Sequence, residues 1–150
     1  MRSWRPSRRM NWRRPAPKSP ASRSSDFPLP IYDGDLQAKS GVPKHAVNLK
    51  RMIGAHHGVL IVTPEYNSSV PALVKNTIDW VSRVQDAHET RGQVFRERVF
   101  AIAAASGGRL GGSRALAALR LILSACHAHG DSEPARAVVR GAMPMTTWTA

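Results

Sequence analysis

The fold of this chain is decided by the stretch Thr63-Pro64-Glu65-Tyr66-Asn67-Ser68-Ser69-Val70-Pro71, which joins a predicted strand to a predicted helix. The apolar run of residues 59–62 leads into it, and such a run, ended by a proline, predicts a strand buried on both faces, as in a parallel sheet. Pro71 suits the first turn of a helix that Ser68 or Ser69 can cap. The loop therefore lies at the carboxyl end of a parallel strand, where open α/β sheets bind ligands.

A second strand and loop of this kind follow in residues 99–108, where an apolar run ends at Ser106-Gly107-Gly108. Gly107 and Gly108 carry no Cβ, so we expect the backbone to approach a ligand closely there and to use positive φ. No Gly-Lys-Ser/Thr follows and the glycine spacing differs from a dinucleotide fingerprint, which excludes both phosphate motifs. Ser113 can then cap a helix that ends at Gly130. Its apolar face consists of Leu116, Leu119, Leu123 and Cys126.

Together the two loops resemble the signature of the NADPH-dependent FMN reductase family, which includes flavodoxin-like quinone and chromate reductases. The matching residues are 63–67, 69–71, 73–80 and 104–111, and the resemblance covers roughly residues 26–129. For a lone Pro-Glu-Tyr-Asn an ordinary strand-to-helix turn would be the favoured interpretation, but a second motif in register makes the resemblance specific. The resemblance implies an α/β fold, a flavodoxin-like doubly wound parallel sheet with three α/β/α layers.

The resemblance also implies a site for FMN at the two loops, with NADPH or NADH as hydride donor and a small molecule as electron acceptor. The residues implied to contact the flavin are Pro64, Glu65, Tyr66, Asn67 and Ser68 in the first loop, and Ser106, Gly107, Gly108 and Arg109 in the second. The cofactor carries the chemistry, so no catalytic side chain and no metal site are expected. A homodimer or homotetramer in the cytoplasm is the implied assembly.

Both ends of the chain depart from the family pattern. No strand and no Gly-Ser-x-Arg-type phosphate loop precede Asp26, although a phosphate site of this kind needs a loop that opens a helix N-terminus. Residues 137–139 are a poor version of the expected final strand. We therefore expect an incomplete reductase domain at 26–130, a divergent tail at 131–150, and an open apolar edge at residues 59–62.

The charge of the chain is concentrated at its N-terminus. The formal net charge is +12, from 22 Lys and Arg against ten Asp and Glu. Residues 1–25 hold eight of these basic groups and no acid, which leaves 14 basic and ten acidic groups, a net of +4, in residues 26–150. This Arg- and Pro-rich composition predicts a disordered basic leader. Trp4 and Trp12 lie among its arginines, a pattern that single-stranded nucleic acid can also use, but a solvated tail is the favoured interpretation.

The remaining features exclude several classes of protein. The single cysteine, Cys126, excludes an internal disulfide and fits a reducing compartment. No apolar run approaches the roughly 18 residues that span a membrane, and the leader lacks the apolar segment of a secretory signal. Cys126 with His127 and His129 allows a metal or thiol site, but a buried thiol on an apolar helix face is the usual case. The alternative functions are a weakly active or inactive relic of the fold and a nucleic-acid-binding module.

Between the motifs, the sequence predicts mainly supporting structure. A helix is expected from Pro43 to about His56, and the charged residues 84–98 are expected to form a surface loop. Asn76 and Asp79 are expected to serve helix packing or a dimer contact rather than chemistry.

Overall fold

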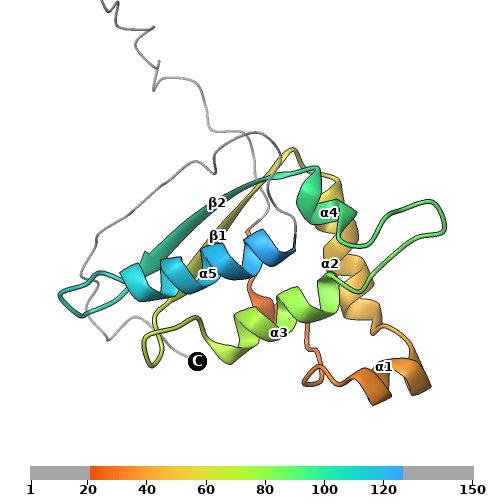
Figure 1. Cartoon of the computed structure of the whole chain (residues 1–150), viewed down its shortest axis with the longest axis horizontal. Helices are drawn as coiled ribbons and strands as arrows, with labels where there is room; N and C mark the ends of the chain where they lie inside the picture. The colour runs from red at the N-terminus through yellow and green to blue at the C-terminus, as the bar shows by residue number, and fades with distance from the viewer. Residues whose placement is uncertain (1–20, 127–150) are drawn as a thin grey trace, which may run out of the picture.

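The computed structural model of the protein describes residues 21–126 (Figure 1). The expectations for residues 1–20 and for the tail at 131–150 lie outside these residues. Residues 21–25, which the predicted leader includes, are described, and Ser24–Asp26 form a 3-10 turn, η1.

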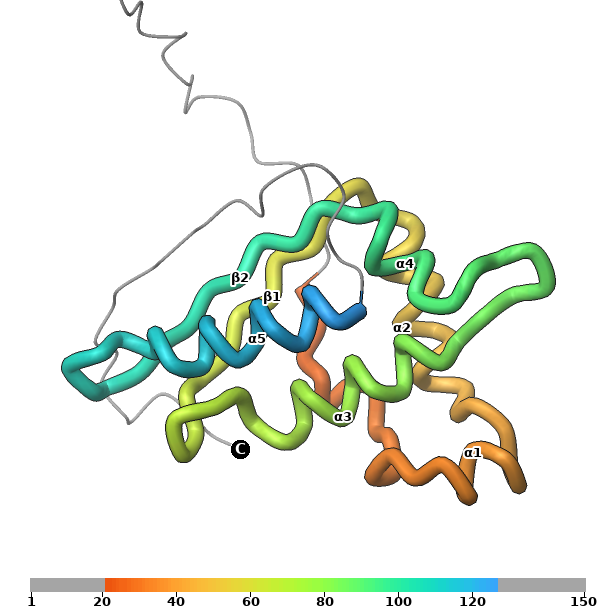
Figure 2. Tube along the Cα trace, viewed as in Figure 1, coloured from red at the N-terminus to blue at the C-terminus, as the bar shows by residue number. Residues whose placement is uncertain are grey.

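Helices and strands alternate along the described chain, as the tube in Figure 2 shows. After η1 the order is α1 (Gly34–Ser40), α2 (Lys44–Gly54), β1 (Gly58–Pro64), α3 (Ala72–Val81), α4 (Gln93–Arg96), β2 (Val99–Ala105) and α5 (Ser113–Ala125). The predicted strand–loop–helix units are thus β1 with α3 and β2 with α5. The helix expected at 43–56 begins one residue later and ends two residues earlier, as α2.

β1 and β2 pair in parallel, from Gly58 opposite Val99 to Pro64 opposite Ala105. Parallel neighbours need a crossover connection, which here contains α3 and α4. The parallel pairing and the alternation of strands and helices confirm the predicted α/β class.

The core lies between one face of the sheet and the helices. Val59 and Ile61 of β1 alternate toward it, beside Phe100 and Ile102 of β2. Helices α2, α3 and α5 close this side, with α5 lying along the strands in Figure 1. The largest fully buried side chains are Trp80, Phe95, Leu119, Val81 and Thr63. Burial of Leu116, Leu119 and Leu123 confirms the apolar face predicted for α5.

The opposite face of β1 corrects one prediction. Leu60 and Val62 are 60% and 59% exposed, so β1 is buried on one face and not on both. No described element covers these side chains, and the described residues therefore supply two of the three layers that the family fold implies. An unbroken apolar run predicts a strand that is apolar on both faces, but it cannot say whether both faces are covered.

The charged segment 84–98 is the expected surface loop only in part, because residues 85–88, 90 and 91 are exposed but residues 93–96 form α4. Its Val94 and Phe95, in α4, are 6% and 2% exposed, and the Phe95 ring stacks on Phe100 with centroids 5.5 Å apart. The same segment is tied to α2, because the ammonium of buried Lys50 contacts Asp86 at 2.6 Å and also Glu89. Val94 and Phe95, two apolar residues inside a charged stretch, were the sequence feature that could have predicted this burial.

Asn76 packs the helix that follows the first motif against the extended segment before α1. Its Oδ1 accepts the backbone N–H of Tyr32 at 2.8 Å, and its Nδ2 donates to the carbonyl of Pro30 at 2.9 Å. The indole of Trp80 donates to the same carbonyl at 2.7 Å. These bonds confirm the packing role expected for Asn76, while Asp79 forms an exposed ion pair with Lys75 one helical turn away.

Candidate functional site

The carboxyl ends of the two strands lie side by side. Pro64 is paired with Ala105, so the loops that follow, residues 65–70 and 106–112, leave the same edge of the sheet together. The strand ends and loops at this edge carry the residues that the sequence assigned to one site, namely Pro64, Glu65, Tyr66, Asn67, Ser68, Ser106, Gly107, Gly108 and Arg109. Parallel strands with loops meeting at their carboxyl ends are the usual ligand-binding position in such sheets.

The first loop is a tight hairpin turn. The N–H of Tyr66 donates to Ser69 O at 3.0 Å, and the N–H of Ser69 donates to Tyr66 O at 2.9 Å. Asn67 and Ser68, the two central residues, have φ of 48° and 64°, as a type I′ turn requires. Asn tolerates this left-handed region, whereas Ser adopts it at a cost. The Tyr66 side chain is 61% exposed at the rim, where an aromatic ring remains available to a ligand.

The second loop is exposed and holds its own turn. The hydroxyl of Ser106 accepts the N–H of Gly108 at 3.2 Å, and Gly107, Gly108 and Arg109 are exposed. A Cβ added to Gly107 would meet nothing within 4 Å, so space for a ligand is open beside this backbone.

Positive φ falls elsewhere in this loop than we expected. The glycines with positive φ are Gly111 and Gly112, at 54° and 77°, and not Gly107 or Gly108. A Cβ on Gly112 would lie 2.6 Å from the Cβ of Ala104, so close packing on β2 also demands glycine there. The pair Gly111-Gly112, directly before α5, was the sequence feature that could have predicted positive φ at this position.

The side chain of Glu65 links the first loop to the start of α5, which directly follows the second loop. Its Oε2 accepts the N–H of Arg114 at 3.1 Å and the N–H of Ala115 at 3.2 Å, in the first turn of α5. The guanidinium of Arg114 donates in turn to the hydroxyl of Ser68 at 3.3 Å. Glu65 therefore caps α5, and the cap predicted for Ser113 is wrong because Ser113 is already the first helical residue.

The caps predicted for α3 are also absent from the described residues. Pro71 occupies the N-cap position, and no side chain, including those of Ser68 and Ser69, caps this helix. The type I′ turn explains this, since it commits the backbone of Tyr66 and Ser69 to each other before the helix begins.

These loops fit the ring of a flavin better than its phosphate. The exposed backbone of both loops and the exposed Tyr66 leave room for a planar ring at the edge of the sheet. A phosphate is commonly held by the first N–H groups of a helix, but at α5 two of these groups already donate to Glu65. Pro64 to Ser68 and Ser106 to Arg109 are therefore candidate ring contacts.

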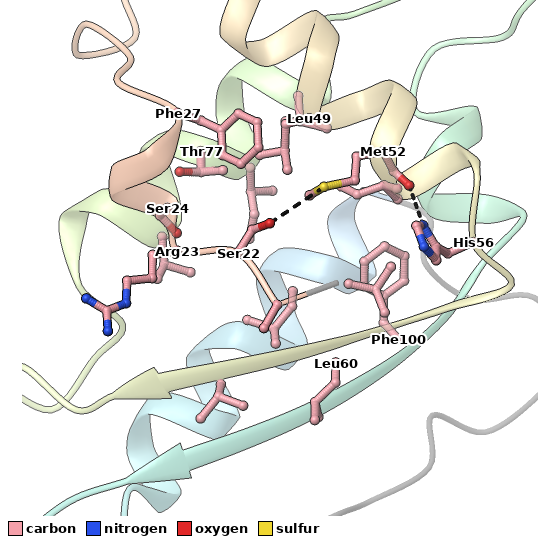
Figure 3. Close-up of a pocket in the computed structure, with 18 of the residues that line it drawn as sticks. Ser22, Arg23, Ser24, Phe27, Leu49, Met52, His56, Leu60, Thr77 and Phe100 are labelled. Atoms are coloured by element: carbon pink, nitrogen blue, oxygen red, sulfur yellow. Dashed lines mark hydrogen bonds between the residues drawn. The ribbon is translucent and has the colours of Figure 1, made fainter. Parts of the chain in front are cut away.

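An apolar cavity of about 510 Å³ lies beside β1, away from these loops. Figure 3 shows Leu49 and Met52 of α2 above it, with Leu60 and Phe100 of the strands below. None of the residues predicted to bind flavin lines it. Within residues 21–126, β1 pairs with β2 alone, so the cavity borders an unpaired strand edge, as the sequence predicted for residues 59–62.

Cys126 behaves as a packing residue. It lies against the core cluster at the end of α5, and burial, followed by the nearby charge of Asp79, raises the pKa of its thiol. A raised pKa disfavours the thiolate that a nucleophile needs. His127 and His129 lie outside the described residues, within which no group of three or more His, Cys, Asp or Glu is placed to hold a metal ion.

Comparison with known proteins gives concordant results. The sequence profile of the NADPH-dependent FMN reductase family matches residues 23–140. The quinone reductase of Escherichia coli K12 is 42% identical over 95 residues, covering 63% of this chain and 47% of that protein. An NAD(P)H-dependent FMN reductase of Pseudomonas aeruginosa is 36% identical over 106 residues, covering 71% of this chain and 54% of that protein. This chain thus spans about half the length of these curated relatives.

A solved structure supports the same assignment. FerB, a flavoenzyme NAD(P)H:(acceptor) oxidoreductase from Paracoccus denitrificans, superposes with a TM-score of 0.56 at 28% identity, covering 85% of this chain and 63% of that one. In the described residues, no helix has both the length and the apolar character needed to cross a membrane. The profile, the relatives and the flavodoxin-like parallel fold together show that this chain belongs to the NADPH-dependent FMN reductase family.

Proposed function

We propose that this chain acts as an NAD(P)H-dependent flavin reductase, which takes a hydride from NADPH or NADH through FMN and passes electrons to a small acceptor of the quinone type. The observation that carries the proposal is the in-register ending of β1 and β2, which places both family loops at one edge of the sheet. The matched relatives include a quinone reductase, which supports that class of acceptor.

Bound FMN would supply the hydride-accepting centre, so the chain itself needs to hold and orient the ring. Backbone N–H groups of Glu65, Asn67 and Ser68 would meet one edge of the ring, and Ser106, Gly107 and Gly108 would meet the other. N–H donors aimed at that edge favour negative charge on the ring, and Arg109 adds positive charge nearby. Tyr66 would pack beside the ring or the nicotinamide. We further propose a cytoplasmic homodimer or homotetramer.

The test is an absorbance spectrum of the purified chain, followed by titration with FMN and with riboflavin. We expect flavin bands in the protein fraction and NAD(P)H oxidation that depends on added quinone. The described residues offer candidate contacts to the flavin ring but not to the phosphate of FMN. The two flavins should therefore bind with similar affinity. A chain that binds neither flavin at millimolar concentration would contradict the proposal. Nanomolar binding with strong preference for FMN would show that a phosphate site exists beyond the described residues.

The alternative of an inactive relic predicts no flavin binding in the same titration. Neither it nor nucleic-acid binding is favoured by the comparisons, because the matching family is one of FMN reductases and the relatives described above are reductases.

A further inference from the structure

We propose that Glu65 is a positioning residue whose carboxylate, by capping α5, fixes the separation of the two loops that hold the flavin ring. The inference rests on the proposed function for the flavin and on the observed hydrogen bonds for the link between the loops. Side-chain contacts join residues 65–70 to the first turn of α5, which directly follows residues 106–112, and the pairing of β1 with β2 joins the starts of the two loops.

The first N–H groups of α5 show why an acceptor is needed. Ser113 donates to Leu110 O at 3.0 Å, and Leu116 donates to Gly112 O at 3.0 Å as the first bond of the helix itself. The N–H groups of Arg114 and Ala115 lie between these two and have no carbonyl available within the helix. They are the second and third groups of the helix, which an N-cap side chain normally satisfies. Glu65 accepts both.

The local sequence cannot supply this cap itself. Gly112 occupies the N-cap position with φ of 77°, and a Cβ there would lie 2.6 Å from Ala104 Cβ. Any residue with a capping side chain is therefore excluded by β2. The acceptor has to come from another segment, and Glu65, 49 positions before Arg114, provides it from the neighbouring loop.

Side chains from both the first loop and α5 contribute to this contact. The Arg114 side chain reaches back to Ser68, at the left-handed position of the first turn. A negative carboxylate at the N-terminus of a helix is also favoured by the helix dipole. Moving residues 65–70 away from α5 would leave two N–H groups without their acceptor, so the loops are held at one separation.

Amide hydrogen exchange in the absence of flavin tests the link independently of function. We expect the amides of Arg114 and Ala115 to exchange about tenfold faster in Glu65→Ala, since tenfold corresponds to about 1.4 kcal/mol, in the range of a hydrogen bond to a charged group. Glu65→Gln retains an acceptor oxygen, so its exchange rates should lie between those of the wild type and Glu65→Ala. Glu97→Gln, which removes an exposed carboxylate beside α4, is the matched control and should not change these amides. Unchanged exchange in Glu65→Ala would overturn the link.

Flavin titration of the same four proteins, together with Glu65→Asp, tests the positioning role. Glu65→Ala should weaken FMN and riboflavin by the same factor of about ten, because the loops hold the ring that both flavins share. Glu65→Asp is one methylene shorter and should resemble Glu65→Ala, whereas Glu65→Gln should restore most of the affinity. Equal affinity of the wild type and Glu65→Ala would overturn the positioning role even if the exchange result holds. A wild type that binds no flavin, with the expected exchange, would refute the proposed function and leave the link standing.

Discussion

The carboxyl end of β1 and the open edge and face of the same strand differ in how many contacts they make with the rest of the described chain. At its carboxyl end, residues 65–70 are closed by reciprocal backbone bonds and joined to α5 through Glu65 and Arg114. Along its length, the strand leaves one edge unpaired within residues 21–126 and exposes Leu60 and Val62 on the uncovered face. The loop end depends on contacts within strand–helix units that the chain contains. The open side depends on neighbouring elements that the described residues do not supply.

The largest loss of stability is expected from a substitution at Gly112, in the loop at the carboxyl end of the strands. Gly112→Ala combines a left-handed backbone, which costs about 1–2 kcal/mol, with overpacking on Ala104, which costs about 1–3 kcal/mol. We expect a loss of about 3 kcal/mol and a thermal midpoint lower by roughly 10 °C. Gly107→Ala is the matched control, because its Cβ meets nothing, and its midpoint should stay within about 2 °C. A Gly112→Ala midpoint as high as that of the control would contradict the packing argument.

Gly112 is also an example of a contact that could not be predicted from the sequence. The strands and the loops at their ends follow from apolar runs ended by Pro64 and by Ser106, and parallel pairing then brings the loops together. The need for glycine at 112 arises from its distance to Ala104, and the cap on α5 comes from Glu65, 49 positions earlier. Neither contact has a local periodicity. The exposure of Leu60 could not be predicted for a related reason, since the apolar run carries no information about what covers each face.

The second prediction concerns Lys50, which ties α2 to the segment after α3. Burial favours its neutral form, but hydrogen bonds to Asp86 and Glu89 outweigh this and raise the pKa of Lys50. The same bonds lower the pKa of Asp86 and, with a backbone hydrogen bond, the pKa of Glu89. The carboxylates therefore contribute stability above about pH 4 that is lost as the pH falls through their lowered folded values. Lys50 contributes stability below about pH 10, and this contribution is lost as the pH rises through its raised pKa in the folded state.

Lys50→Met should accordingly lower the thermal midpoint by several degrees at pH 7 and reduce the dependence of the midpoint on pH between about 5 and 2. The measurement is thermal unfolding followed by circular dichroism over that range. Lys75→Met is the matched control, because the Lys75–Asp79 pair lies on the surface of α3 with side chains 50% and 29% exposed. Equal shifts in the two variants would show that the ion pairs of buried Lys50 add nothing beyond a surface pair.

A smaller change of opposite sign is expected at Ser68. Its φ of 64° suits glycine, so Ser68→Gly should raise the free energy of unfolding by about 0.5 kcal/mol. The substitution also removes the 3.3 Å bond from Arg114. Asn67→Gly is the control, since Asn tolerates the left-handed region and should gain less. Chemical denaturation measures both variants, and a loss of stability in Ser68→Gly would mean that the Arg114 bond outweighs the backbone strain.

The smallest effect on stability, and the clearest probe of the open side, is expected from Leu60→Lys with Val62→Lys. Both side chains are already about 60% exposed, so replacing them removes little buried area, and the thermal midpoint should change by no more than about 2 °C. Association should change more, because an unpaired strand with exposed apolar side chains is a template for pairing with another chain, and lysines on such an edge oppose it. We expect light scattering at high protein concentration to fall in the double variant. The matched control is Val59→Lys, on the buried face of the same strand, which should lower the midpoint strongly instead. A large midpoint loss in the Leu60 and Val62 variant would show that a segment outside residues 21–126 covers this face, and the contrast between the two sides of β1 would then disappear.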